Sequence, residues 1–398
     1  MVERTLLPTL IARARQAPVV TVTGPRQSGK TTLVRQAFPR HSYASLEDPE
    51  LREHALADPR SFLRQFSGPA ILDEAQRAPQ LFSYLQGLVD DQPEAGRFIL
   101  SGSQNFLLMR SISQSLAGRT ALLHLLPFSL SELEQRPGID LEKLNSELAP
   151  APIPSSREVW ETLWKGFYPR IHDRGLDPQV WLADYTRTYV ERDVREVLQI
   201  GDLEAFGRYV RLCAGRSGQL LNLSSLATDC GISHSTAQRW LSILEASFLV
   251  ALLRPHHQNL GKRLIKAPKL YFLDTGLLCY LLRIRDPEEL RFHAARGAVF
   301  ESFVVADLLK GALHRGQEPA LHFWRDSTGH EVDVLLDFGS RHLPVEVKAG
   351  ETLSAEAFDS LNWWRRLAGA EQAPAALIYA GARSYRRGEV EVLSWAVL

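Results

Sequence analysis

The segment GPRQSGKTT at residues 24–32 directly follows the β-branched run VVTVT, and this pair of features constrains the fold more than any other part of the chain. Its two glycines, lysine and first threonine have the spacing of a P-loop, whose backbone N–H groups turn inward around phosphate oxygens. Such a loop requires a strand before it and a helix after it. Residues 19–23 have the composition of the strand, and residues 31–38 have the length and apolar spacing of the helix. The sequence therefore predicts a nucleotide site on an α/β sheet.

The side chains of this loop have defined tasks toward a bound nucleoside triphosphate. Lys30 supplies a point charge for the β and γ phosphates, and the hydroxyl of Thr31 is positioned to ligate Mg²⁺. We expect the whole loop to line the nucleotide. The predicted contact residues are Gly24, Pro25, Arg26, Gln27, Ser28, Gly29, Lys30, Thr31 and Thr32.

Two further segments predict strands that end in polar residues. The run PAILDEAQ ends in two acids, of which Asp73 is placed to hold Mg²⁺ through water and Glu74 to polarise the water that attacks the γ phosphate. Paired acids favour hydrolysis over binding alone. The run RFILSGSQN carries Ser101 and Ser103 at its end. Ser103 is either a sensor of the γ phosphate or part of an ordinary strand-end turn.

The composition is that of a globular protein and does not suggest a disordered or fibrous chain. Of the 398 residues, 46 are Lys or Arg and 46 are Asp or Glu, so no overall field directs the chain to nucleic acid or to a membrane. The three cysteines lack metal-ligand or redox spacing. No run approaches about 18 apolar residues, and the N-terminus lacks the pattern of a secretory signal. We expect a cytoplasmic protein of several domains with no membrane segment.

A second informative pattern lies in residues 222–250, NLSSLATDCGISHSTAQRWLSILEASFLV. A short helix meets a tight turn at Gly231, and in the helix that follows Ala237, Leu241 and Leu244 share one apolar stripe. This is the pattern of a helix-turn-helix. The opposite stripe is polar and suits a DNA groove or a phosphate backbone.

Basic residues gather after this motif. Between Arg254 and Leu273 the chain carries five Lys or Arg residues and no acid, as a DNA-binding wing requires. Because few of the polar residues are base-reading arginines, we expect structure-dependent or backbone binding of DNA rather than sequence-specific recognition. A winged helix that only packs between domains remains the alternative. The predicted DNA contacts are His234, Ser235, Gln238, Arg239, Lys262, Arg263 and Lys266.

The C-terminal part of the chain combines an acid-bearing helix with a strand pair. The segment FESFVVADLLK predicts an amphipathic helix with Glu301 near its start, and the segment HFWRDSTGHEVDVLLDFGSRHLPVEVKAG predicts two strands joined by a turn at residues 338–341. Folding that hairpin brings Asp333 next to Glu346, and Lys348 projects on the same face as Glu346. Carboxylates beside a lysine make a hard oxygen site for Mg²⁺ or Mn²⁺, suited to phosphodiester hydrolysis.

Together GPRQSGKTTL, ILDEAQ, ILSGSQ and LAGRTALLHLLPFSLSE resemble the AAA-type P-loop ATPases that carry a C-terminal DUF4143 domain, and the resemblance covers nearly the whole chain. It implies that ATP is the ligand of the P-loop, with Walker A at the loop, Walker B at Asp73 and Glu74, and a polar sensor near Ser103. It also implies an α/β fold with four modules. Their predicted bounds are 1–135 for a parallel-sheet ATPase core, 136–205 for a linker and helical lid, 206–290 for a winged helix-turn-helix, and 291–398 for a restriction-endonuclease-like domain.

The arrangement D…ExK resembles the core of the PD-(D/E)xK nuclease superfamily. That resemblance implies that Glu301, Asp333 and Glu346 are metal ligands and that Lys348 positions or activates the nucleophile. The proline of the superfamily's name is absent, because Val332 precedes Asp333. Many relatives keep this fold as a non-cutting scaffold, so cleavage and scaffolding remain open.

The AAA resemblance further implies assembly into a ring or other oligomer, such as a hexamer. Arg119 is predicted either to reach a neighbouring subunit's nucleotide as a charge-stabilising finger or to form a surface salt bridge.

The leading interpretation is an ATP-hydrolysing protein that binds DNA and translocates on it or remodels branched DNA such as a Holliday junction. One alternative is a nucleotide-gated switch in which ATP changes how the later domains dock. Another is a metal-dependent nuclease that ATP regulates. The preferred DNA structure, the direction of movement and the pathway stay open.

Overall fold

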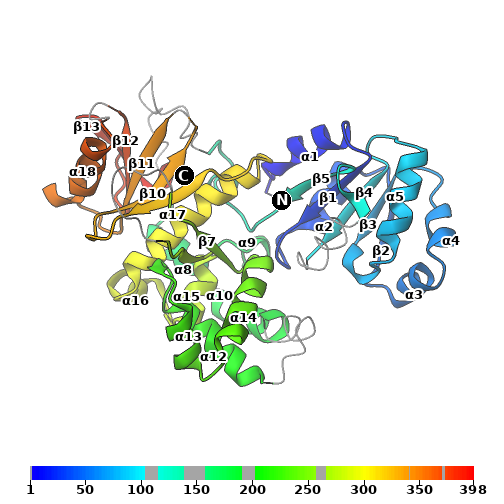
Figure 1. Ribbon diagram of the computed structural model, residues 1–398, viewed down its shortest axis with the longest axis horizontal. Coiled ribbons are helices and arrows are strands. Elements are labelled where there is room, and N and C mark those ends of the chain that lie inside the picture. Colours follow the sequence, from blue (N-terminus) through cyan, green and yellow to red (C-terminus); the bar gives the residue numbers. More distant parts are fainter. Residues whose placement is uncertain are drawn as a thin grey trace. The chain divides into compact units, whose positions relative to one another are not determined.

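The computed structural model describes residues 2–103, 115–138, 157–190, 202–256, 266–339, 341–369 and 373–398. They form two compact units (Figure 1). Unit 1 consists of residues 1–128 with the short pieces 246–248 and 310–318. Unit 2 consists of residues 129–245, 249–309 and 319–398.

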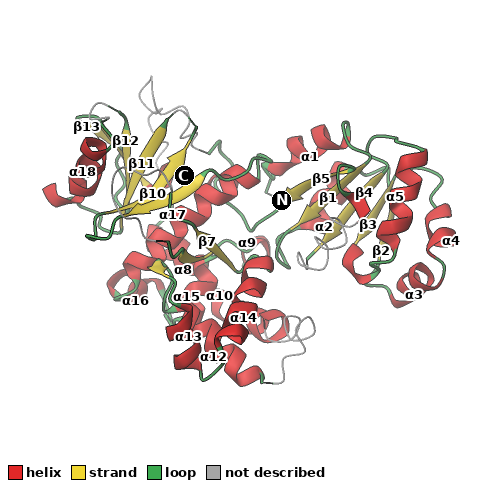
Figure 2. Ribbon diagram, viewed as in Figure 1, coloured by secondary structure: helices red, strands yellow, loops and turns green. Residues whose placement is uncertain are grey.

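Unit 1 is built on a five-stranded parallel sheet with the strand order β2-β3-β4-β1-β5. Figure 2 shows its strands and helices by type. The strands are β1 (Val19–Thr23), β2 (Ser42–Ser45), β3 (Ala70–Asp73), β4 (Phe98–Gly102) and β5 (Thr120–His124). The helices are α1 (Leu6–Ala14), α2 (Lys30–Ala37), α3 (Pro49–Ala57), α4 (Pro59–Arg64), the 3₁₀ turn η1 (Ala75–Arg77) and α5 (Leu81–Asp91).

Alternating strand residues bury both faces of this sheet. Val19 joins an apolar cluster with side chains of α3, α4 and α5, whereas Val20 and Val22 join a second cluster with side chains of α1 and α2. Every residue of β1 is buried, as expected for a central parallel strand covered on both sides. Because β4 lies between β1 and β3, the carboxyl ends of these strands meet at one edge of the sheet. The P-loop and the two polar strand ends therefore come together.

Unit 2 begins with short helices and continues into a winged helix. The early elements are α7 (Leu130–Leu133), α8 (Val159–Lys165), α9 (Pro169–Arg174), α10 (Pro178–Tyr185) and the π-helical turn η4 (Thr186–Val190). The winged helix comprises α12 (Leu203–Ala214), α13 (Leu223–Cys230), α14 (His234–Ala246) and a sheet of the strands β6 (Gln219–Leu220), β8 (Lys269–Phe272) and β7 (Val250–Leu253). Next come α15 (Thr275–Leu281) and α16 (Pro287–Phe292). Both contact α8, so the helices predicted as a lid pack within unit 2.

The last sheet has six strands in the order β13-β14-β12-β11-β10-β9 and mixes parallel with antiparallel pairs. Its strands are β9 (Leu321–Arg325), β10 (Glu331–Asp337), β11 (His342–Lys348), β12 (Ala375–Tyr379), β13 (Tyr385–Arg387) and β14 (Val390–Ser394). The associated helices are α17 (Arg296–Leu313), the 3₁₀ turn η5 (Ala355–Phe358), α18 (Asp359–Leu367) and the 3₁₀ turn η6 (Trp395–Val397). Helix α18 contacts β10 and β11. The predicted α/β class, with a parallel ATPase-like core and a separate C-terminal sheet, is confirmed. Among the described segments, no helix has both the length and the apolar character needed to cross a membrane.

Candidate nucleotide site and acidic cluster

The P-loop connects β1 to α2 and depends on glycine at two points. Gly24 has a φ of +154° and Gly29 a φ of +94°, conformations that side chains disfavour. A Cβ atom on Gly24 would lie 2.0 Å from the carbonyl oxygen of Leu125. The loop therefore lies against the chain that follows β5, in a shape that no larger residue at position 24 permits.

Lys30 is the first residue of α2 and is only 6% exposed. Its Nζ donates hydrogen bonds to the carbonyl oxygens of Gly24 at 2.9 Å and Pro25 at 2.7 Å. Burial lowers the pKa of Lys30 to about 8, although the charges of Glu74 and Asp73 oppose this. An ammonium group that is buried against neutral carbonyl groups is stabilised by a nearby anion. The phosphates of a nucleotide bound at this loop would supply that anion.

Asp73 at the end of β3 joins two other strands to the P-loop helix. Its Oδ2 accepts hydrogen bonds from the Thr31 hydroxyl at 2.8 Å and from the Tyr43 hydroxyl at 2.9 Å. Its Oδ1 accepts a hydrogen bond from the hydroxyl of Ser101. The predicted metal-binding pair, Thr31 and Asp73, is therefore in direct contact. Tyr43 on β2 was not predicted, because nothing near it in the sequence marks it as part of this site.

Glu74 follows Asp73 with a φ of +53°, which is uncommon for a residue other than glycine. Its Oε2 accepts hydrogen bonds from Gln76 Nε2 at 2.5 Å and from the Ser103 hydroxyl at 3.1 Å. Such backbone conformations persist where neighbouring contacts enforce them, and they cluster at functional sites. The structure thus brings the predicted catalytic acid into contact with the predicted sensor.

Arg4 supports the loop although sequence reasoning missed it. Its guanidinium donates hydrogen bonds to the carbonyl oxygens of Ser28 and Leu126, each at 2.7 Å, and lies over the ring of Phe128. Arg4 precedes Ser28 by 24 residues, so no local pattern links them. Among the remaining predicted loop contacts, Pro25 and Ser28 are buried, Arg26 is half-buried, and Gln27 and Thr32 are exposed.

The donor set fits a nucleoside triphosphate with Mg²⁺. The buried hydroxyl of Ser28 in the loop has no hydrogen-bond partner among the described residues, as expected of a group that contacts a ligand. The Thr31 hydroxyl and the Asp73 carboxylate are the hard oxygen ligands that Mg²⁺ prefers. Lys30, Thr31 and Asp73 would hold the magnesium-bound phosphates, with Glu74 beside them.

Arg119 lies in the turn before β5 and pairs with Asp90 near the end of α5. Its Nε and one terminal nitrogen donate to the two carboxylate oxygens at 2.5 and 2.8 Å. The structure therefore shows the salt-bridge alternative for this residue. Its role as a finger toward a neighbouring subunit stays a prediction.

The helix-turn-helix has the predicted local structure. Gly231 follows α13 with a φ of +72°, and the Ser233 hydroxyl accepts a hydrogen bond from the Thr236 N–H at 3.1 Å at the start of α14. The predicted apolar stripe is buried. The opposite stripe of α14 is exposed and consists of His234, Ser235, Gln238, Arg239 and Ser242.

The structure removes one residue, Lys269, from the predicted basic wing. Lys262 and Arg263 lie outside the described residues, and Lys266 is exposed. Lys269 does not belong to a DNA-facing wing, because it is only 3% exposed. It begins β8, the central strand of its sheet, and its side chain enters a group of acids.

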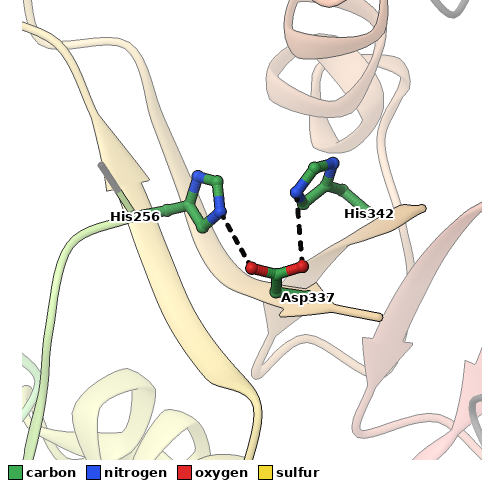
Figure 3. A group of neighbouring side chains, drawn as sticks. All are labelled: His256, Asp337 and His342. Carbon is green, nitrogen blue, oxygen red and sulfur yellow. Dashed lines mark hydrogen bonds and ion pairs between the residues drawn. The ribbon is translucent and has the colours of Figure 1, made fainter. Parts of the chain in front are cut away.

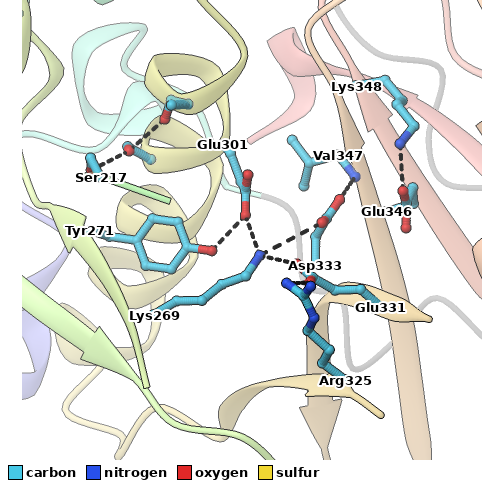
Figure 4. Close-up of polar contacts among 12 residues, drawn as sticks. Ser217, Lys269, Tyr271, Glu301, Arg325, Glu331, Asp333, Glu346, Val347 and Lys348 are labelled. Atoms are coloured by element: carbon cyan, nitrogen blue, oxygen red, sulfur yellow. Dashed lines mark hydrogen bonds and ion pairs between the residues drawn. The ribbon is translucent and has the colours of Figure 1, made fainter. Parts of the chain in front are cut away.

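Figure 4 shows Lys269 among carboxylates from α17 and β10. Its Nζ lies 3.0 Å from Glu301 Oε1 and 4.0 Å from Asp333 Oδ1, and it forms an ion pair with Glu331. The Tyr271 hydroxyl, also on β8, donates to Glu301 Oε1 at 2.6 Å. We call this group the acidic cluster; its members are Lys269, Tyr271, Glu301, Glu331, Asp333, Glu346 and Lys348. A basic residue from the winged helix thus lies within the predicted nuclease site.

The hairpin of β10 and β11 supplies the other predicted residues. The ladder between β9 and β10 shifts register between Val332 and Leu335, a stretch that includes Asp333, and an irregularity of this kind can re-aim a side chain. Asp333 Oδ2 accepts a hydrogen bond from the Val347 N–H at 2.9 Å, and Lys348 Nζ donates to Glu346 Oε1 at 2.5 Å. Glu346 Oε2 is buried and has no hydrogen-bond partner within the part of the chain that the structure describes.

The charges of the acidic cluster favour a bound cation. Burial raises the pKa of Asp333 well above its usual range, and the charges of Glu346 and Glu301 add to this against the opposing Lys269. Burial also raises the pKa of Glu346, while Lys348 lowers it. The carboxylate oxygens of Asp333 and Glu346 are hard ligands of the kind that Mg²⁺ or Mn²⁺ prefers. The ammonium of Lys269 competes for the place of such an ion beside Asp333 and Glu301.

Three family models match this chain in succession. An AAA domain model matches residues 16–134, a domain of unknown function (DUF8612) matches residues 156–288, and a domain of unknown function (DUF4143) matches residues 296–398. Uncharacterised proteins of Mycobacterium tuberculosis and Mycobacterium bovis are each 33% identical to it over 361 residues, which cover 89% of this chain and 76% of each relative. The chain belongs to the AAA–DUF4143 family.

Two further matches have lower sequence identity. An uncharacterised protein of Methanocaldococcus jannaschii is 21% identical to this AAA–DUF4143 protein over 342 residues, covering 81% of this chain and 73% of the relative. A solved structure, the Walker-type ATPase of Pyrococcus abyssi, matches 70% of this chain and 94% of its own with 13% identity and a TM-score of 0.41. The winged helix lies in the DUF8612 match, and the hairpin of the acidic cluster lies in the DUF4143 match.

Proposed function

We propose that this AAA–DUF4143 protein hydrolyses ATP at the P-loop and uses the cycle to translocate on DNA or to remodel branched DNA. The observation that carries this proposal is the position of Asp73, which hydrogen-bonds the P-loop Thr31 and the β4 residue Ser101 while Glu74 is held beside it. A site that only bound a nucleotide would not need a second, separately held carboxylate.

Each residue of the nucleotide site has a role in this proposal. Lys30 binds the β and γ phosphates, and Thr31 and Asp73 hold Mg²⁺, which screens the phosphate charge when bound. Glu74 orients the attacking water and accepts its proton. Ser103 fixes the carboxylate of Glu74 through the 3.1 Å hydrogen bond.

The exposed face of α14 supports DNA as the partner. It presents hydrogen-bonding side chains without acids at positions 234, 235, 238 and 239, and Lys266 is exposed in the segment before β8. Side chains of this kind suit phosphate and groove-edge contacts. Arg239 is the permanent cation of that face and is therefore its most informative single position.

The test is the ATPase rate at fixed salt without DNA and with single strands, duplex and four-way junctions. We expect DNA to raise the rate of the wild type and Arg239→Ala to reduce that stimulation, while the basal rate stays unchanged. Arg285→Ala is the matched control, because Arg285 is also an exposed arginine but belongs to the segment between α15 and α16 rather than to α14. If no DNA changes the wild-type rate, coupling to DNA is refuted and the nucleotide-gated switch becomes the better account.

Tryptophan emission can test the nucleotide-gated switch in this chain. All eight tryptophans lie at or after residue 160, so they belong to unit 2. A change in tryptophan emission on adding ATP therefore reports a response of unit 2 to nucleotide bound in unit 1. A response without DNA stimulation favours the switch.

Metal-dependent cleavage is a second candidate function. The buried Oε2 of Glu346 favours it, because this atom has no hydrogen-bond partner among the described residues and the Glu346 charge acts on Asp333. Nicking of supercoiled DNA with Mn²⁺ tests it. Asp333→Asn and Lys348→Ala should each abolish nicking while ATPase activity survives. If the wild type and Lys269→Met both leave the DNA intact, the acidic cluster is a scaffold.

Assembly belongs to the same proposal. We propose that the protein forms an oligomer such as a hexamer, with Arg119 leaving Asp90 for a neighbour's nucleotide. Sedimentation with and without ATP tests the assembly, and an unchanged ATPase rate in an assembled Arg119→Ala variant would contradict the finger.

A further inference from the structure

A group of histidines and one acid lies at the other end of the β10–β11 hairpin from Asp333. Asp337 is the last residue of β10 and His342 the first of β11, and the two are direct cross-strand partners. Side chains of such a pair lie on the same face of the sheet. No part of the proposed ATPase or nuclease chemistry uses them.

His256 reaches the same place from a third segment. The chain after β7 pairs with β9 through a parallel bridge between Pro255 and Phe323, and the His256 N–H donates to the Phe323 carbonyl at 2.8 Å. This pairing fixes the backbone of His256. Its imidazole then points at Asp337, as Figure 3 shows.

The ligand atoms of His256, Asp337 and His342 lie close enough together to bind one ion. His256 Nε2 lies 3.3 Å from Asp337 Oδ2, and His342 Nε2 lies 3.5 Å from Asp337 Oδ1. The contact between His256 and Asp337 is a hydrogen bond, but a long one, because charge-assisted hydrogen bonds are usually about 2.7–2.9 Å. Tetrahedral Zn²⁺ with bonds of about 2.0–2.2 Å separates its ligand atoms by roughly 3.3–3.5 Å. All three ligand atoms lie within 4.8 Å of one another.

The surroundings hold these side chains in place. His256 is buried, and its ring packs against that of His342 with centroids 4.8 Å apart. A further imidazole, His322 on β9, packs against His256 at 5.3 Å. Asp337 Oδ1 accepts a hydrogen bond from the Gly339 N–H at 2.8 Å, an outer contact that orients a metal-binding carboxylate.

We propose that His256, Asp337 and His342 bind a divalent transition-metal ion of the zinc class. Two imidazoles and one carboxylate suit Zn²⁺ and its neighbours Co²⁺, Ni²⁺ and Cu²⁺ rather than Mg²⁺. The site is distinct from the acidic cluster, because Asp337 is four residues beyond Asp333 along β10, about 13 Å at 3.3 Å per residue. The bound ion joins the segment after β7 to the C-terminal sheet and so has a structural role.

The first test uses the full-length chain, free of any added histidine tag and stripped with a chelator. We expect one Zn²⁺ per chain by competition with a chelating dye, and visible absorption bands of tetrahedral Co²⁺ on substitution. His342→Asn and Asp337→Asn should each weaken Zn²⁺ binding by at least about 100-fold, since each removes one of three ligands, whereas outer contacts alone change affinity by about 10–100-fold. His234→Asn, at an exposed histidine on α14, is the matched control and should bind as the wild type does. Equal affinity in the wild type and in His342→Asn overturns the proposal.

The second test needs no change to the ligands. Trp364 lies with its ring centroid 6.4 Å from that of His342. One equivalent of Cu²⁺ should therefore quench part of the tryptophan emission, and the quenched fraction should fall in Trp364→Phe but not in Trp240→Phe, at a residue of α14. Quenching that is the same in both variants shows binding elsewhere and overturns the assignment.

Discussion

Replacing Lys269 by methionine tests whether the acidic cluster is a buried ionic unit. The change keeps the apolar stem and removes the ammonium from the carboxylates of Glu301, Glu331 and Asp333. Removing one partner of a buried ion pair costs about 3–5 kcal/mol, because the remaining charge is left uncompensated. With a urea slope of about 3 kcal/mol/M, the midpoint of unfolding falls by about 1 to 1.7 M.

The effect depends on pH with a defined sign. Burial by itself would lower the pKa of Lys269, but the charges of Glu301, Asp333 and Glu331 outweigh it and raise the pKa above the usual value. Lys269 is therefore charged throughout the neutral range. Burial and the neighbouring acids raise the pKa of Asp333, so the folded state binds more protons there than the unfolded state does, and stability falls as pH rises through that window. Because Lys269→Met removes the opposing cation, its destabilisation should be larger at pH 8 than at pH 5.

The assay is urea unfolding followed by tryptophan emission, which reports unit 2 because all eight tryptophans lie there. Lys266→Met is the matched control, since Lys266 is an exposed lysine in the segment just before Lys269. We expect Mn²⁺ to restore part of the lost stability in Lys269→Met by taking the place of the ammonium. If Lys269→Met unfolds at the same urea midpoint as the wild type and Lys266→Met, the reasoning is refuted.

Two further predictions concern the P-loop. Because the pKa of Lys30 without ligand is about 8, the association constant for ATP should fall about tenfold between pH 7 and pH 9, as measured by calorimetry; a constant value would show that the charge of Lys30 is not required. Gly24→Ala should abolish nucleotide binding in a folded protein, because its Cβ would lie 2.0 Å from the Leu125 oxygen, whereas Gly68→Ala, with nothing within 4 Å, should bind normally. Normal ATP affinity in Gly24→Ala would contradict the loop geometry.

The nucleotide site was predictable because its chemistry imposes a local pattern. A loop that encloses phosphates needs glycines at fixed spacing, and Asp73 with Glu74 is recognisable at the end of an apolar run. Arg4 and Tyr43 were not predictable, since they reach the site from distant segments and neither belongs to a motif. Tertiary contacts of this kind leave no periodic signal in one sequence.

The later domains show where reasoning from charge fails. Lys269 belongs to a run of basic residues, yet β8 buries it among acids that lie 32 and 64 residues further along the chain, at Glu301 and Asp333. The hairpin of β10 and β11 was predicted by its alternation, but β9 and the register shift between Val332 and Leu335 were not. The site of His256, Asp337 and His342 also escaped prediction, because His256 lies far in sequence from the other two.

The hydrolysis of ATP under single-turnover conditions by the wild type and by Glu74→Gln tests the central claim most directly. The substitution keeps the size of the side chain and a carbonyl oxygen that accepts from Gln76 and Ser103. Loss of a general base typically lowers the rate by about 10²–10⁴-fold, and ATP affinity should stay within about threefold. A Glu74→Gln variant that binds and splits ATP as fast as the wild type would contradict the account.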